Sequence, residues 1–129
     1  MSARELAGAI AARRLSAVEV MTAYLDHIAA LNPKLNAIVA LQEREGLLAQ
    51  ARERDAQVAA RKIMGPLHGL PHAVKDLQPV KGIRSTSGSP ILKDFIPTQD
   101  SLVVERMRAA GAIFIGKTNT PEFGLGSHT

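Results

Sequence analysis

The sequence contains no cysteine and no tryptophan, and it has only one tyrosine and three phenylalanines in 129 residues. The lack of cysteine excludes a disulfide framework, cysteine zinc sites, iron–sulfur ligation and a thiol nucleophile. The low aromatic content leaves almost no side chains on which single-stranded nucleic acid could stack. Apolar runs are short, whereas a membrane helix needs roughly 20 apolar residues, and the N-terminus lacks the pattern of a signal peptide. We therefore expect a soluble, cytoplasmic protein without a membrane partner.

Sixteen Lys and Arg against 12 Asp and Glu give a net charge of +4, and 46% of the residues are apolar, enough for one hydrophobic core. The charges do not gather in one basic segment. From residue 43 to 55, acidic and basic side chains alternate as they do on a solvated helix face. Nucleic acid is therefore not expected as a partner, although a non-catalytic assembly or nucleic-acid-binding module stays open as an alternative.

Residues 1–64 are the predicted helical region of a single domain that covers residues 1–129. Two Ser-x-x-Glu sequences, starting at Ser2 and Ser16, fit the capping box that begins a helix. The second helix is expected to end at Asn32-Pro33, because proline disfavours helical geometry in the residue before it. Residues 36–41 could be helix or strand. A charged helix is then expected from Glu43 to about Lys62, with an inner side formed by Leu47, Leu48, Ala51 and Val58.

Residues 65–129 are the predicted lysine-bearing loop and βαβ region. Glycine and proline are frequent up to residue 100, so loops should dominate there. We expect a brief strand over Leu70 to Lys75 and an apolar strand over Ala112 to Ile115. Between them, Asp100-Ser101 should begin a helix that Gly111 ends, with Val103, Met107 and Ala110 facing inward. The predicted fold class is α/β: N-terminal helices followed by the first βαβ portion of a mixed, largely parallel sheet.

Residues 111–118, with the sequence GAIFIGKT, match the P-loop pattern of nucleotide-binding proteins. A P-loop needs a strand before its first glycine and a helix after its lysine, so that backbone amides point at the phosphates. Here a helix is predicted before Gly111, and the residues between the glycines are the predicted strand itself. A P-loop ATPase is therefore only a distant third possibility.

His68 and His72 have the spacing of a helical metal pair, but Gly69 and Pro71 lie between them and no third ligand is near. We therefore predict no metal site and no cofactor. The hydroxyl-rich segment Ser85 to Ser89 lacks the Gly-x-Ser-x-Gly pattern of a nucleophilic serine, and its composition is typical of a turn-rich loop.

Lys75 is the strongest candidate for chemistry. It ends an apolar segment, and partial burial would lower the pKa of its amine and allow it to act as a base near neutral pH. The alternative is a surface ion pair between Lys75 and Asp76, which would contribute almost nothing. The local sequence alone leaves both interpretations open.

Two ordered blocks resemble the amidase signature family. The first, residues 65–76 with the sequence GPLHGLPHAVKD, resembles the family segment G-P-L-x-G-[IV]-P-x-x-[VI]-K-D. The second runs from Asp100-Ser101 through the segment at 115–123, IGKTNTPEF, to the GSHT sequence at 126–129. The loop from Ser85 to Ser89 falls where the family has a T-T-x-G-S stretch, and the amphipathic N-terminal helices also look like the family's opening region. The resemblance therefore extends over nearly all of the chain.

The resemblance implies a hydrolase of carboxamide C–N bonds that uses a Ser–cis-Ser–Lys triad, with Lys75 in the place of the lysine base. In such enzymes the neutral lysine accepts a proton through one serine from a second serine, which attacks the amide carbon. Relatives that transfer the released ammonia to another substrate share this chemistry. Both triad serines belong to a G-G-S-S-G-G block that is absent from these 129 residues. We therefore expect an N-terminal fragment that is inactive alone and that associates with itself or with a complementing downstream segment.

Overall fold

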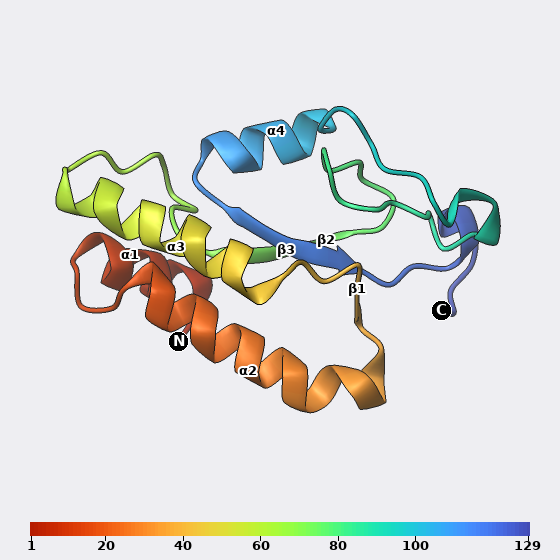
Figure 1. Cartoon of the computed structure of the whole chain (residues 1–129), viewed down its shortest axis with the longest axis horizontal. Helices are drawn as coiled ribbons and strands as arrows, with labels where there is room; N and C mark the ends of the chain where they lie inside the picture. The colour runs from red at the N-terminus through yellow and green to blue at the C-terminus, as the bar shows by residue number, and fades with distance from the viewer.

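The computed structural model describes all 129 residues, which form helices on both faces of a small mixed sheet (Figure 1). In chain order the elements are α1 (Ala3–Ala11), α2 (Ala17–Leu35), β1 (Ile38–Val39), α3 (Arg44–Ala59), β2 (Pro71–Lys75), α4 (Leu102–Ala109) and β3 (Ile113–Thr118), with single 3-10 turns η1 (Pro90–Leu92) and η2 (Glu122–Gly124). The predicted α/β class is therefore confirmed.

The sheet has the order β1-β3-β2, so the most apolar strand is the central one. β2 and β3 are parallel and are connected through α4, which confirms the predicted βαβ unit. β1 pairs with the other side of β3 in the antiparallel direction. The segment at 36–41, for which the sequence leaves helix and strand open, therefore supplies an edge strand.

Both predicted capping boxes begin helices. The Ser2 hydroxyl accepts the amide of Glu5 at the start of α1, and the Ser16 hydroxyl accepts the amide of Glu19 at the start of α2. In each box the glutamate carboxylate accepts the serine amide in return. These hydrogen bonds lower the pKa of both glutamates.

The predicted end of the second helix at Asn32-Pro33 is wrong. α2 continues through Pro33 to Leu35 and ends at Asn36, which has a left-handed backbone conformation. The Asn32 side chain accepts the amide of Ile38 at 2.7 Å and donates to its carbonyl at 2.8 Å. These two bonds hold Asn32 in the helix although a proline follows, and they fix the start of β1.

The predicted inner side of α3 is confirmed for Leu47, Ala51 and Val58, which are buried, while Leu48 is partly buried. In α4, however, the inward residue is Val104, which is fully buried, whereas Val103 is 46% exposed. The face of α4 that carries Val104 and Met107 points inward because these two side chains pack on the cluster around Phe114. Gly111, with φ +99°, follows the helix as predicted.

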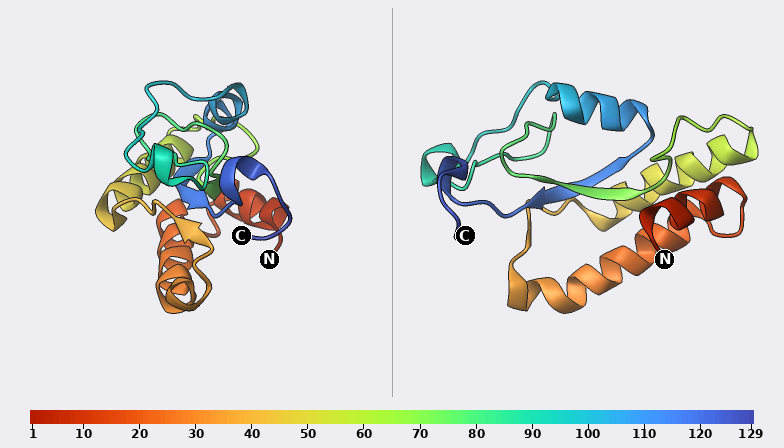
Figure 2. Two further views of the ribbon diagram at one scale, coloured as in Figure 1. Left: turned by 90° about the vertical axis from the view of Figure 1, so that its right-hand side faces the viewer. Right: turned by 180° about the vertical axis from the view of Figure 1, so that it is seen from behind.

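The sheet has a separate apolar cluster on each face. Ile113 and Ile115 pack against α2 and α3 on one face, whereas Phe114 and Val74 pack against Val104 of α4 on the other. Figure 1 and the rear view in Figure 2 show the same layers, with α4 on one side of the sheet and α1 to α3 on the opposite side.

A β-bulge in β3 changes which face its later residues occupy. His72 pairs with Phe114 and Ala73 pairs with Gly116, so Ile115 is an extra residue opposite one step of β2. Successive strand residues point to opposite faces, and the extra residue reverses this alternation. Lys117 therefore projects toward the α4 face, together with its partner Val74.

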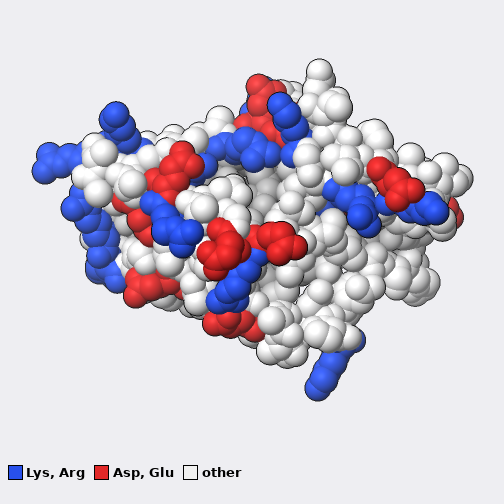
Figure 3. Space-filling model, viewed as in Figure 1, with Lys and Arg blue, Asp and Glu red and all other residues white.

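The surface charges are of mixed sign. In the view of Figure 3, Lys and Arg are interspersed with Asp and Glu over the helical part, without a continuous basic region on this face. No helix combines the length and the apolar character required to span a membrane.

Candidate functional site

Lys75 is the last residue of β2, and its side chain is exposed. The expected partial burial of this lysine is therefore wrong for the 129 residues described, because none of them covers the Lys75 side chain. Lys75 takes part in none of the ion pairs of the chain. Because successive strand residues point to opposite faces, the Lys75 side chain projects from one face of the sheet and those of Val74 and Asp76 project from the other.

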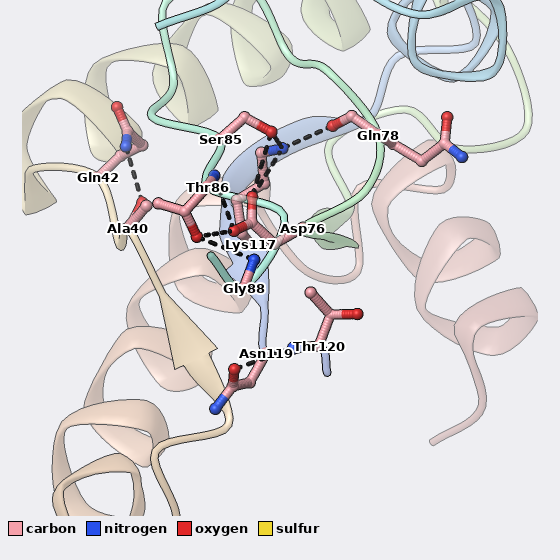
Figure 4. Close-up of polar contacts among 10 residues, drawn as sticks. All are labelled: Ala40, Gln42, Asp76, Gln78, Ser85, Thr86, Gly88, Lys117, Asn119 and Thr120. Carbon is pink, nitrogen blue, oxygen red and sulfur yellow. Dashed lines mark hydrogen bonds and ion pairs between the residues drawn. The ribbon is translucent and has the colours of Figure 1, made fainter. Parts of the chain in front are cut away.

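The surface pair between Lys75 and Asp76 is also absent. Asp76 is only 2% exposed and contacts a different lysine, Lys117, which is completely buried. Their Nζ and Oδ1 atoms lie 3.5 Å apart. The acidic residue next to Lys75 is thus part of the interior, and Figure 4 shows its contact with Lys117.

Ser85 completes a closed ring of polar contacts with this pair. The Lys117 ammonium donates to the Ser85 hydroxyl at 3.1 Å and to the carbonyl of Gln78. The Ser85 hydroxyl in turn donates to Oδ1 of Asp76 at 3.2 Å. The buried lysine therefore has a partner for each of its three protons (Figure 4).

The second carboxylate oxygen of Asp76 holds the loop that follows Ser85. Its Oδ2 accepts the amide of Thr86 at 3.0 Å and the Thr86 hydroxyl at 2.7 Å. The Thr86 hydroxyl accepts the amide of Gly88 at 3.1 Å. Ser87 and Gly88 both have positive φ, at 50° and 68°, so the backbone turns sharply here. The predicted turn-rich loop is confirmed, and its hydroxyls bind the end of β2.

The electrostatics of this cluster are governed by burial. Desolvation lowers the pKa of Lys117, while the charge and hydrogen bond of Asp76 act in the opposite direction. The lysine of this chain that has a perturbed amine is therefore Lys117, which lies near the end of the P-loop-like segment. The strand predicted there, over Ala112 to Ile115, is confirmed, but β3 continues to Thr118 and presents Lys117 to the interior.

Sequence reasoning missed Asp76, Lys117 and Thr86 as members of one cluster. The sequence offers only a weak signal for this cluster. Lys117 follows one predicted strand, over Ala112 to Ile115, and Asp76 directly follows the other, over Leu70 to Lys75. Their contact depends on the pairing of β2 with β3 and on the bulge, neither of which local sequence reveals.

The two histidines of the metal-pair spacing have separate roles. Nδ1 of His68, a buried residue, accepts the amide of Met64 at 3.2 Å, and Nε2 lies 3.0 Å from the carbonyl of Arg54. His72 lies on β2 and contacts the Phe114 ring edge-on, with ring centroids 5.7 Å apart. Burial lowers the pKa of His72. No three His, Asp or Glu side chains come together in a way that could hold a metal ion.

The model of the Amidase family matches residues 19–129. A glutamyl-tRNA(Gln) amidotransferase subunit of Salinispora tropica is 48% identical over 128 residues, which are 99% of this chain and 26% of that protein. An acylamidase of Rhodococcus erythropolis is 43% identical over 124 residues, which are 96% of this chain and 26% of that protein.

Among solved structures, native peptide amidase from Stenotrophomonas maltophilia superimposes with a TM-score of 0.87 at 35% identity, over 95% of this chain and 25% of that one. The chain thus spans about a quarter of the length of the relatives that it matches. The family match over most of the residues, together with these relatives, shows that the chain belongs to the amidase family.

Proposed function

We propose that this chain is the lysine-bearing, N-terminal portion of an amidase that cleaves carboxamide C–N bonds, and that Lys75 is its general base. The observation that carries the proposal is the position of the Lys75 amine. It is exposed at the end of β2 and is engaged in no ion pair, while the next residue, Asp76, binds the hydroxyl-rich loop. Resemblance to the family's lysine segment at residues 65–76 supports the same role.

A lysine can accept a proton only when its amine is neutral. Desolvation lowers the pKa of a lysine amine and so supplies the neutral form. In our proposal, the part of the enzyme that carries the two triad serines covers Lys75 and removes it from water. The amine then takes a proton through the first serine from the second serine, whose oxygen attacks the amide carbon. The same proton passes back to the amide nitrogen as the C–N bond breaks and the amine leaves. Water then attacks the acyl group on the serine oxygen, which releases a carboxylic acid and restores the serine hydroxyl.

The proposed substrate class is a carboxylic amide. The relatives carry the names acylamidase, peptide amidase and glutamyl-tRNA(Gln) amidotransferase. We propose hydrolysis as the reaction, with ammonia transfer as the alternative outcome of the test. Because the amidotransferase relative is named as one subunit of its enzyme, further protein subunits are the partners expected for that alternative.

The test joins residues 1–129 to the downstream three-quarters of the Rhodococcus erythropolis acylamidase and measures amide cleavage and ammonia release. We expect the fusion to hydrolyse amides and Lys75→Ala to reduce kcat by several orders of magnitude. Lys62→Ala is the control, because Lys62 is also an exposed lysine but lies beyond the end of α3. A folded fusion without activity, or full activity in Lys75→Ala, would contradict the proposal.

Glutamine-dependent ammonia transfer is distinguished in the same assay. If ammonia is released only when an acceptor substrate and additional amidotransferase subunits are present, the reaction is ammonia transfer and not hydrolysis. Lys75 would remain the base in either reaction.

A further inference from the structure

The buried pair of Asp76 and Lys117 is not required by the proposed proton transfer, which uses only Lys75 of this chain. Burial of two charges is also a poor source of stability, since apolar side chains of similar volume often replace a buried ion pair without loss. The pair is nonetheless fully enclosed, with residue exposures of 2% and 0%. Its contacts therefore suggest a role in geometry.

The pair connects two segments that are distant in sequence. The amide of Asp76 donates to the carbonyl of Thr118 at 3.0 Å, which extends the pairing of β2 and β3 past Lys75. Its carboxylate binds Ser85 and Thr86 through both oxygens. The backbone of Lys75 is thus fixed on its C-terminal side by a residue that also holds the hydroxyl loop.

The bulge in β3 makes this arrangement possible. With uninterrupted alternation from Ile113, Lys117 would project toward α2 and α3, away from Asp76. The extra residue before Gly116 directs it toward the α4 face, where Asp76 lies. The close approach of β1 and the residue after it favours glycine at this point, because a Cβ on residue 116 would lie 3.0 Å from the carbonyl oxygen of Ala40.

We propose that Asp76 and Lys117 are positioning residues, which fix the Lys75 backbone and the loop from Ser85 to Gly88 in one arrangement. The inference rests on the proposed function of Lys75. The Asp76 carboxylate contacts Ser85, Thr86 and Lys117, and Lys117 neutralises the charge of that carboxylate.

The kinetic test compares Asp76→Asn and Lys117→Met in the fusion enzyme. We expect each variant to lower kcat about a hundredfold, the cost of a small misplacement of a reacting group, with little change in KM. In the double variant the losses should be far from additive, because the two residues act as one unit.

The matched control is Asp100→Asn. Asp100 forms a bidentate pair with Arg108 and accepts the amide of Lys81, so it also ties a loop to the α4 side of the sheet. This variant should lower the melting temperature without changing kcat or KM of the folded enzyme. If Asp76→Asn and Lys117→Met behave in this way too, their role is merely structural and the inference is overturned.

A second measurement keeps the inference testable if Asp76→Asn does not fold. Thr86→Val removes the 2.7 Å hydroxyl contact but leaves the ion pair in place. In the 129-residue chain we expect it to accelerate hydrogen exchange of the Gly88 amide, with exchange in α2 unchanged, and in the fusion to lower kcat. Normal kcat in Thr86→Val would contradict the inference.

The two proposals fail in distinguishable ways. Full activity in Lys75→Ala overturns the proposed function. Loss of activity in Lys75→Ala with normal kinetics in the Asp76, Lys117 and Thr86 variants overturns only the positioning role.

Discussion

Val74 of β2 and Lys117 of β3 pair directly across the parallel ladder and project from the same face of the sheet. Val74 is part of the apolar cluster under α4, while Lys117 binds the next residue on that face, Asp76. The same ladder pairs Lys75 with Thr118, on the opposite face. One pairing register therefore separates the exposed lysine of the proposed mechanism from the buried one.

Removal of one member of the buried pair should destabilise the chain more than removal of both. Asp76→Ala leaves Lys117 enclosed without its carboxylate, and we expect a loss of about 3–5 kcal/mol. Asp76→Leu combined with Lys117→Met removes both charges and should cost less than either single change. Urea unfolding measures the free energies. Additive losses in the double variant would contradict the coupling.

The free energy of unfolding of the chain should also vary with pH in the alkaline range because of Lys117. Burial lowers the pKa of this amine from its ordinary value of 10.5. Between the lowered pKa and the ordinary value, the unfolded chain binds a proton that the folded chain lacks, so stability rises with pH in that window. Urea unfolding at a series of pH values should show this rise in the wild-type chain but not in Lys117→Met. Lys62→Met, at an exposed position, should retain it, and parallel profiles for all three proteins would refute the assignment.

Asp55 should contribute more to stability than Asp26, although both are acidic residues on neighbouring helices. The Asp55 carboxylate accepts the first amides of α2, from Ala17 at 2.6 Å and from Val18 at 3.2 Å. We expect Asp55→Ala to cost about 1–2 kcal/mol, as does the loss of a helix cap. Asp26 forms only an exposed pair with Arg44, so Asp26→Ala should cost at most about 0.5 kcal/mol. Equal melting temperatures for the two variants would disprove this difference.

Two glycines with similar backbone angles should tolerate alanine differently. Gly88 and Gly82 have φ of +68° and +79°, but a Cβ on Gly88 would lie 2.6 Å from the carbonyl oxygen of Thr120, whereas one on Gly82 meets nothing within 4 Å. Gly82→Ala should therefore cost only the backbone strain, about 1–2 kcal/mol. Gly88→Ala should cost more and displace the loop, which thermal unfolding and hydrogen exchange of the Thr86 amide would reveal. A smaller loss in Gly88→Ala than in Gly82→Ala would be inconsistent with the structure.

The isolated chain is expected to associate with itself and to lack amidase activity. Ile91 and Ile96 are 81% and 55% exposed, and Phe95 between them is 47% exposed. Burial of such side chains on association is favourable by about 25 cal/mol per Å² of apolar surface. Sedimentation velocity should show concentration-dependent association that Ile91→Lys reduces. A monomer at all concentrations, or amide hydrolysis by the rigorously purified chain, would contradict this expectation.

Local patterns predict the elements of this fold well where a single segment decides its own structure. The capping boxes at Ser2 and Ser16 need only residues within one turn, and the apolar run at 112–115 needs only its own composition. The pattern at Pro33 misleads because two hydrogen bonds between the Asn32 side chain and the Ile38 backbone hold the helix through Pro33. These bonds form only after the chain has turned back.

The site is harder to predict because it depends on pairings between distant segments. Lys75 can be found from its segment, and its role stays a prediction. Apolar neighbours in sequence suggest that Lys75 is buried, but the interior encloses Lys117 instead, because strand alternation and the bulge decide which lysine points inward. The partner of Asp76 lies on another strand, beyond the reach of any local pattern.

The central place of β3 also constrains the order in which the chain can assemble during synthesis. Its partners, at 38–39 and 71–75, are translated long before residues 113–118. Neither edge strand has a neighbour until β3 emerges from the ribosome, a delay of several seconds at about 5–20 residues per second. During that interval the cluster between α2 and α3 lacks Ile113 and Ile115, and the Asp76 carboxylate remains in water without Lys117.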